Sequence, residues 1–251
     1  MLLAVNIGNT NIRFGLFSEN VCKVSWIINT KPMKTSDELL VLFSSMYEKY
    51  ALKSDIITKI VLGSVVPNLT QNVALTLQKL HNIEPKIVDR NTKSEVEHTS
   101  NQMGTDLYAN AVSAHYLYPG NKIVVDFGTA LTLITLDEKG LILGVIIAPG
   151  IVTSLNSLIG NTAQLTEIEF KKPKSVLGMD TISCMQSGIV YGFIGMIEGL
   201  IERIKHDQQK DFFVLSTGGL GDIYAPLTDK INVNDKLHTL KGLNLLYSLE
   251  K

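Results

Sequence analysis

Hydrophobic and polar positions alternate with a period of two in three short segments near the start of the chain, and the same pattern returns in its second half. The first set spans residues 2–7, 11–17 and 21–28, and the second spans 121–127, 130–136 and 141–147. Such alternation predicts β-strands. Because tight turn residues separate the first two strands of each set, a hairpin is expected at the start of both halves.

Segments with helical periodicity follow each set of strands. Thr35 and Glu38 have the spacing of a capping box ahead of one such segment. Further helices are expected from residue 65, near residue 104, over 181–204 and over 237–249, with short strands at 60–62, 86–88 and 212–215. The least regular stretch is 89–102. The predicted order is three strands, then helix, strand, helix, strand and helix, and it occurs twice.

The two hairpin turns resemble each other at a constant offset of 120 residues. Asn6 and Gly8 in the first correspond to Asp126 and Gly128 in the second. A glycine lets backbone N–H groups approach a phosphate oxygen, and an acidic residue before the turn suits a hydrated Mg²⁺. Further side-chain donors in these turns are Asn9, Thr10 and Thr129. A single turn of this kind can be purely conformational, but two copies favour phosphate binding.

Composition narrows the class of protein. The chain has 251 residues, 45% of them hydrophobic, and a net charge of −1. The duplication predicts two lobes, 1–118 and 119–251, each near the usual domain size. Without a basic excess, neither nucleic acid nor an anionic membrane is an expected partner. No secretory leader or membrane span is predicted, and two distant cysteines, Cys22 and Cys184, fit a reducing cytoplasm.

Two further features leave alternatives open. Gly188, Gly192, Gly195 and Gly199 share one face of the predicted helix over 181–204. Since each glycine costs about 1 kcal/mol in a helix, close packing is expected there, either within the chain or across a dimer interface. The five histidines lack metal-ligand spacing and are expected in surface or capping roles.

The repeated element order, with a phosphate-type turn in each repeat, is the plan of the actin-like ATPase and sugar-kinase fold. We therefore expect an α/β protein with a duplicated actin-like (ribonuclease H-like) fold, whose two lobes flank a nucleotide cleft. In that fold a glycine pair after a late strand lies by the adenosine. Here the corresponding residues are Thr217, Gly218 and Gly219.

Within this superfamily the chain resembles type III pantothenate kinase along almost its whole length. The segments that carry the resemblance are 6–11, 64–67, 104–106, 125–130, 148–150, 162–165, 185–188, 217–219 and 240–243. The resemblance implies ATP-dependent phosphorylation of pantothenate to 4'-phosphopantothenate, the first step of coenzyme A biosynthesis. It also implies Mg²⁺, a monovalent cation (K⁺ or NH₄⁺), and a homodimer with the pantothenate pocket at its interface.

The resemblance also assigns roles to residues. Asp106 matches the catalytic aspartate, expected to be ionised beside a helix N-terminus, although a simple helix cap is the alternative. Gly104, Thr105, Asp106 and Thr181 match the substrate site, and Asp126 matches the cation position. The residues expected at ATP and its phosphates are Asn6, Gly8, Asn9, Thr10, Gly128, Thr129, Thr217, Gly218 and Gly219.

Three positions depart from the family pattern. Asn6 stands where the family has an aspartate, and Leu107 stands where it has an arginine. Counting back from Asp106 without gaps, Glu97 stands where relatives have a tyrosine. An amide lacks the charge that holds Mg²⁺, and leucine offers no bidentate partner for a carboxylate. Either other residues compensate, or the chain is a weakened family member that acts on another small hydroxyl substrate or regulates by binding. An actin-like sugar or acetate kinase is less favoured, because the chain lacks their lid insertions.

Overall fold

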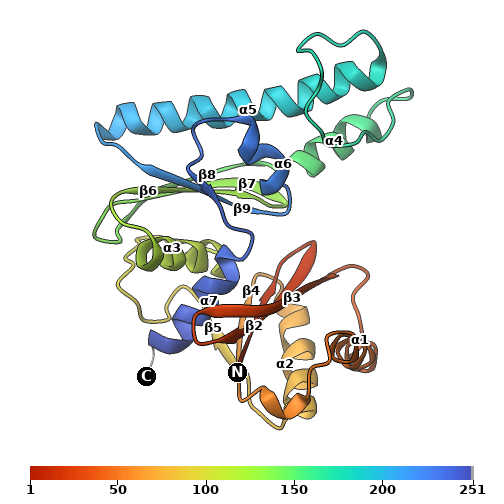
Figure 1. Ribbon diagram of the computed structural model, residues 1–251, viewed down its shortest axis with the longest axis vertical. Helices are drawn as coiled ribbons and strands as arrows, with labels where there is room; N and C mark the ends of the chain where they lie inside the picture. Colours follow the sequence, from red (N-terminus) through yellow and green to blue (C-terminus); the bar gives the residue numbers. More distant parts are fainter. Residues whose placement is uncertain (250–251) are drawn as a thin grey trace. The chain divides into compact units, whose positions relative to one another are not determined.

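The computed structural model describes residues 1–249, and the chain divides into two compact units (Figure 1). The first unit comprises Met1–Tyr116 together with the segment from Leu237 onward, and the second comprises Leu117–Lys236. The division expected from the sequence, at 118/119, lies two residues further along the chain. It also placed the C-terminal helix in the second lobe, whereas that helix is part of the first unit.

The first unit contains a five-stranded sheet in the order β3-β2-β1-β4-β5. β1 pairs antiparallel with β2 and parallel with β4, so a hairpin lies beside parallel crossover strands. Its elements are β1 (Leu2–Ile7), β2 (Asn11–Ser18), β3 (Val21–Asn29), α1 (Ser36–Lys49), β4 (Lys59–Ser64), α2 (Pro67–His81), β5 (Lys86–Val88), α3 (Thr105–Leu117) and α7 (His238–Leu249), with a 3₁₀ turn, η1 (Ser54–Ile56). This order confirms the predicted first repeat.

Alternate residues of the first two strands build the core on one face of this sheet. Leu3, Val5 and Ile7 of β1 pack in one apolar cluster with side chains of α1 and α2, as do alternate residues of β2. The predicted capping box begins α1: the Glu38 N–H donates to Thr35 Oγ1, and the Thr35 N–H donates to Glu38 Oε2. Because the odd-numbered residues of β1 are committed to this core, its even-numbered residues face the other side.

Helix α7 packs on that other side, against β1 and β4. A Cβ added at Gly63 of β4 would overlap Leu243 of α7, and one added at Gly242 would overlap the carbonyl of Ala109 in α3. The helix follows the last strand of the second repeat in sequence, but its apolar face meets the first sheet. This long-range packing explains why chain order placed it in the wrong unit.

A buried polar network joins α7 to α3. His238 is fully buried and contacts the Asn110 carbonyl (3.0 Å) and Ser113 Oγ (3.2 Å), while the Thr239 hydroxyl donates to Asn110 Oδ1 (2.7 Å). The expectation that every histidine lies on the surface or caps a helix is therefore wrong for His238. A polar side chain is tolerated there because partners replace the water it loses.

The second unit repeats the plan, with strand order β10-β9-β6-β7-β8. Its elements are β6 (Lys122–Phe127), β7 (Ala130–Leu136), β8 (Ile142–Pro149), α4 (Ile151–Gly160), α5 (Thr181–Gln208), β9 (Phe213–Gly218), α6 (Gly221–Tyr224), η2 (Ala225–Leu227) and β10 (Val233–Asn234). In both sheets the hairpin strand that precedes the turn lies at the centre. The matched strand orders confirm the duplication inferred from the two turns, and α4 is an addition in the second copy.

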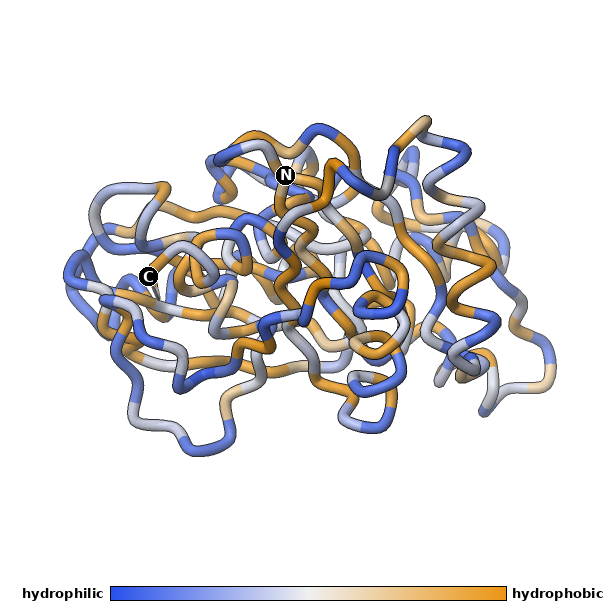
Figure 2. The backbone as a smooth tube through the Cα atoms, turned by 90° about the horizontal axis from the view of Figure 1, so that it is seen from below, coloured by the Kyte–Doolittle hydropathy of each residue, from blue (hydrophilic) through white to orange (hydrophobic). Residues whose placement is uncertain are grey.

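Helix α5 supplies the core on one face of the second sheet, through side chains that include Val190, Ile194, Ile197 and Ile201. By length and composition it is the one helix within residues 1–249 that could cross a membrane, but 44% of its apolar window is buried inside the protein. Hydrophobic and hydrophilic residues alternate along the helical coils of Figure 2. The buried apolar side chains of α5 pack in the core of the second unit.

Candidate active site

The first hairpin turn connects β1 to β2 through Gly8, Asn9 and Thr10. The Gly8 N–H donates to the Asn11 carbonyl (3.0 Å), and its own carbonyl accepts from Thr30 Oγ1 (2.7 Å). A Cβ added at Gly8 would lie only 3.2 Å from the Asn11 oxygen, so the tight turn favours glycine. Asn9 and Thr10 are exposed. The turn therefore presents backbone and side-chain polar groups at the end of the strand.

The second hairpin turn connects β6 to β7 through Gly128 and Thr129. The Thr129 carbonyl accepts from the Gly150 N–H (3.2 Å) and from Thr153 Oγ1 (2.8 Å), which fixes the turn to the start of α4. A Cβ added at Gly128 would lie 3.2 Å from the Ala130 carbonyl oxygen. Thr129 itself is exposed, so its side chain can meet a ligand.

Asp126, the acidic residue before this turn, lies against a second glycine. Gly218 at the end of β9 has a φ of +97°, and a Cβ added there would lie 2.6 Å from Asp126 Oδ1. The neighbouring Gly219 is exposed, and its N–H donates to the Phe127 carbonyl (3.2 Å). The structure thus brings Asp126, Gly128 and the predicted adenosine-side glycines together at one end of the second sheet.

Two threonines flank Asp126 in the sheet register. Thr132 of β7 and Thr217 of β9 are its direct partners on the neighbouring strands, so the three side chains share one face. Both hydroxyls are buried and have no hydrogen-bond partner within residues 1–249. Buried polar atoms without partners are costly, and hard cations prefer carboxylate and hydroxyl oxygens. This row therefore fits a cation, and it adds Thr132, which sequence reasoning missed, to the candidate site.

Asp106 lies in the first turn of α3. One carboxylate oxygen, Oδ1, accepts from the Leu107 N–H (2.8 Å) and would lie 2.7 Å from a Cβ added at Gly104. Burial raises the pKa of the Asp106 carboxyl, and hydrogen bonds from the Leu107 and Asp106 N–H groups offset this only in part. Desolvation therefore outweighs the backbone hydrogen bonds that favour the ionised form. A carboxylate with a raised pKa is a stronger proton acceptor.

Thr105 anchors the start of the same helix to the first sheet. It is buried, and its Cγ2 lies 3.0 Å from a Cβ added at Gly63 of β4. A Cβ added at Gly104 would lie 3.3 Å from Cγ1 of Val65, in the segment after β4. Since a side chain at either glycine would push the helix away, these contacts set the position of the Asp106 carboxylate relative to the end of the sheet.

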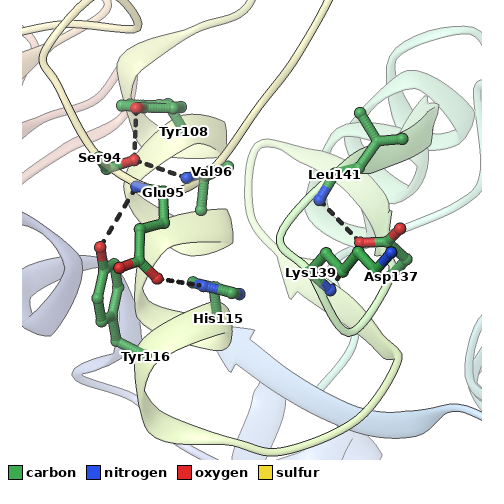
Figure 3. Close-up of polar contacts among 9 residues, drawn as sticks. All are labelled: Ser94, Glu95, Val96, Tyr108, His115, Tyr116, Asp137, Lys139 and Leu141. Carbon is green, nitrogen blue, oxygen red and sulfur yellow. Dashed lines mark hydrogen bonds and ion pairs between the residues drawn. The ribbon is translucent and has the colours of Figure 1, made fainter.

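Part of the irregular segment before α3 is held against that helix, as Figure 3 shows for Ser94 and Glu95. The Tyr108 hydroxyl contacts Ser94 Oγ (2.7 Å) and donates to the Thr92 carbonyl (2.8 Å). Glu95 contacts His115 Nε2 (3.2 Å) through its carboxylate, and its N–H donates to the Tyr116 hydroxyl (3.3 Å). This part of the loop is therefore held beside the Asp106 helix by side chains of that helix.

Thr181 is the first residue of α5 and is exposed. The cap of this helix is Asp180, whose carboxylate accepts from the Ser183 N–H (2.9 Å), so Thr181 has no capping role. The predicted site residues therefore divide between the units. The first holds Asn6, Gly8, Asn9, Thr10, Gly104, Thr105 and Asp106, and the second holds Asp126, Gly128, Thr129, Thr181, Thr217, Gly218 and Gly219.

No three His, Cys, Asp or Glu side chains within residues 1–249 gather into a metal-ligating group. A divalent ion would therefore depend on few protein ligands and on oxygens that a bound ligand supplies, as Mg²⁺ commonly does with nucleotide phosphates. Asp126, with the neighbouring hydroxyls of Thr132 and Thr217, offers the most suitable protein oxygens for such an ion.

Comparison with known proteins decides the family. The model of the type III pantothenate kinase family matches residues 2–203. The type III pantothenate kinase of Agathobacter rectalis is 42% identical, over 98% of this chain and 96% of its own. That of Finegoldia magna is 38% identical, over 100% and 98%. This chain belongs to the type III pantothenate kinase family.

Solved structures agree on the fold. A putative Baf family transcriptional activator from Campylobacter jejuni superposes with a TM-score of 0.63 at 19% identity, over 98% of both chains. A putative 2-dehydro-3-deoxygalactonokinase from Sinorhizobium meliloti gives 0.61 at 12% identity, over 99% of this chain and 96% of its own. At these identities the likeness extends to the fold alone, which is the actin-like and sugar-kinase fold predicted from the sequence.

The three departures from the pantothenate kinase pattern have distinct surroundings. Asn6 is buried in β1, where Gly63 and Arg13 are its register partners. Leu107 is half-buried directly after Asp106, and its N–H supports that carboxylate. Glu97 is exposed in the irregular loop. The first two therefore lie in or directly beside predicted site residues, whereas Glu97 faces solvent.

Proposed function

We propose that this chain transfers the γ-phosphoryl group of ATP to the terminal hydroxyl of pantothenate, giving 4'-phosphopantothenate in the first step of coenzyme A biosynthesis. The observation that carries this proposal is the Asp106 carboxylate, positioned by Gly104 and the Leu107 N–H and made more basic by burial. Phosphoryl transfer needs positioning, charge stabilisation and an acceptor for the hydroxyl proton. Asp106 is our candidate for that acceptor.

The hairpin turns are our candidates for the phosphate contacts. Gly8 and Gly128 keep the turns tight enough for backbone N–H groups to approach phosphate oxygens, and Asn6, Asn9, Thr10 and Thr129 add polar groups. We assign Thr217, Gly218 and Gly219 to the nucleotide, and Gly104, Thr105 and Thr181 to pantothenate.

Two cations complete the proposal. When bound, Mg²⁺ neutralises charge on the transferring phosphates, and a monovalent ion such as K⁺ or NH₄⁺ adds fixed positive charge. Asp126 with its flanking threonine hydroxyls fits a cation that takes oxygen ligands. Because Asn6 carries no charge, we expect Mg²⁺ to be held mainly by the ATP phosphates and Asp126.

We further propose a homodimer through α5. Nothing lies within 4 Å of a Cβ added at Gly188, Gly192, Gly195 or Gly199, so the glycine face is open. Apolar side chains at Val176, Leu177, Met179 and Ile182 are also exposed beside the start of this helix. An uncovered face of small residues with adjacent apolar surface favours close approach of a second copy.

The remaining expectations follow from charge and cysteine chemistry. A net charge of −1 gives no reason to expect nucleic acid or membrane as a partner, and two unpaired cysteines fit a reducing cytoplasm. We therefore place the reaction in the cytoplasm, with pantothenate, ATP and a second copy of the chain as partners.

The test is ADP release by the purified protein in Mg²⁺, with and without pantothenate and with K⁺, NH₄⁺ or Na⁺. Pantothenate-dependent release supports the proposal. Because Leu107 replaces an expected arginine, a weakened family member that acts on another small hydroxyl substrate, or that regulates by binding, is the second candidate. ATP binding without pantothenate-dependent release under all three cations would favour that second candidate.

A further inference from the structure

Arg13 lies beside Asn6 on the same face of the first sheet. The antiparallel register pairs Asn6 of β1 directly with Arg13 of β2, and the parallel register pairs Asn6 with Gly63 of β4. The flanking β2 residues, Ile12 and Phe14, belong to the core on the opposite face. Arg13 therefore projects from the side that carries Asn6, with Cβ atoms about 4.5–5.5 Å apart.

The same row leads towards Asp106. A Cβ added at Gly63 would lie 3.0 Å from Thr105, the first residue of α3. Adjacent strands are about 4.8 Å apart, so the row from Arg13 through Asn6 to Gly63 covers roughly 10 Å. An arginine side chain is long enough to extend over the short Asn6 side chain. The Arg13 guanidinium can thus reach the part of the sheet end that lies beside the Asp106 helix.

Among residues 1–249, Arg13 has no acidic partner. The side chain is half-buried, and no carboxylate within residues 1–249 forms an ion pair with it. Its cross-strand neighbour is an amide, which accepts a hydrogen bond but does not neutralise charge. A partly desolvated guanidinium without a counter-charge is unfavourable, and it gains most from a phosphate or carboxylate.

The second hairpin has a negative charge, and it stands on the central strand, at the position that matches Asn6. There Asp126 is paired with Thr132 of β7, a small neutral residue. The two copies therefore differ in the sign of the charge beside the turn, with the Asp126 carboxylate in one and the Arg13 guanidinium in the other. A carboxylate with hydroxyl neighbours suits a cation, whereas a guanidinium beside an amide suits an anion.

We propose that Arg13 binds the β- and γ-phosphate oxygens of the nucleotide directly, at the strand position where Asn6 cannot recruit a metal ion. This role rests on the proposed kinase function, because it presupposes a nucleoside triphosphate at the first hairpin turn. It makes the first hairpin the phosphate-holding copy and the second hairpin the cation-holding copy of the duplicated motif.

Calorimetric titration of the full chain with ATP, ADP, AMP and pantothenate, in EDTA and again in Mg²⁺, tests the assignment. In Arg13→Gln, ATP affinity in EDTA should fall by about 10- to 100-fold, as for loss of a hydrogen-bonded charge, while AMP affinity changes less than about twofold. Asn6→Asp should also weaken ATP binding in EDTA, because the new carboxylate pairs with the guanidinium and repels the phosphates. Lys23→Gln removes an exposed cation from the adjacent strand β3 and should change nothing.

The outcomes separate this inference from the kinase proposal. Unchanged ATP affinity in Arg13→Gln, or an equal loss for ATP and AMP, would overturn it even if the enzyme phosphorylates pantothenate. A loss confined to pantothenate affinity would assign Arg13 to the substrate carboxylate and also reject it. Wild-type protein that binds ATP but does not turn over pantothenate would reject only the proposed substrate.

Discussion

Replacing Asp106 by asparagine separates its proposed role as a base from a role in starting α3. Asparagine has the same shape, and its side-chain oxygen can still accept from the Leu107 N–H, a contact of 2.8 Å in the structure. The substitution removes the negative charge and, with it, the ability to take a proton. We expect turnover to collapse while the helix start is preserved.

The expected loss is large. Removal of a general base commonly costs about 10²–10⁴ in rate, which at about 1.36 kcal/mol per tenfold corresponds to roughly 2.7–5.4 kcal/mol of transition-state stabilisation. ATP affinity should stay within about twofold, because the carboxylate acts on the hydroxyl substrate.

The free energy of unfolding should not fall with turnover in this variant. Burial raises the pKa of Asp106 in the folded state above its value in the unfolded chain. The contribution of this group to the free energy of unfolding is therefore full below the unfolded pKa and is lost as pH rises through the folded pKa. At neutral pH the buried, ionised carboxylate therefore lowers the free energy of unfolding. Asp106→Asn should be at least as stable as wild type there.

The assay combines pantothenate-dependent ADP release, ATP titration and thermal unfolding at several pH values. In the wild type the acid limb of kcat/KM should lie above the ordinary range of an aspartate, since the pKa of Asp106 is raised. Thr35→Ala is the matched stability control: it breaks the capping box of α1, should cost about 1 kcal/mol, and should spare turnover. Near-normal turnover of Asp106→Asn with a lowered melting temperature would mean that Asp106 is only a helix cap and that the base lies elsewhere.

Three other substitutions test the remaining assignments. Asn6→Asp should lower the Mg²⁺ concentration needed for half-maximal activity, and an unchanged or higher requirement would place this residue outside the metal shell. Replacing both Gly192 and Gly195 by leucine should give monomers in sedimentation, whereas an unchanged dimer mass contradicts the α5 interface. Gly218→Ala should cost about 1 kcal/mol or more and weaken monovalent-cation activation, because φ is +97° and the new Cβ would lie 2.6 Å from the site carboxylate. Gly144→Ala, with nothing within 4 Å, is its control and should show no loss of cation activation.

The sequence by itself determined the local elements and the duplication. Period-two alternation places β1 to β3 and β6 to β8 to within two residues, because a strand with one core face must alternate. The Thr35 and Glu38 pair is read directly because a capping box depends on residues three apart. The two turns were found for the same reason, since each is a short run of residues whose chemistry does not depend on distant neighbours.

Tertiary structure decided whatever depends on distant residues. Helix α7 joined the first unit because its leucines pack on β1 and β4, contacts that chain order does not reveal. His238 became buried because Asn110 and Ser113 of another helix satisfy its ring nitrogens.

The electrostatics of the site also depend on residues that are distant in the sequence. The sequence predicts that Asp106 lies at a helix start. The pKa of its carboxyl rises because folding removes water from around it. The pairing of Asn6 with Arg13 likewise follows from strand register. Desolvation and cross-strand contacts both arise only when the chain has folded, which is why the sequence placed the candidate residues in order but could not give their charge states or neighbours.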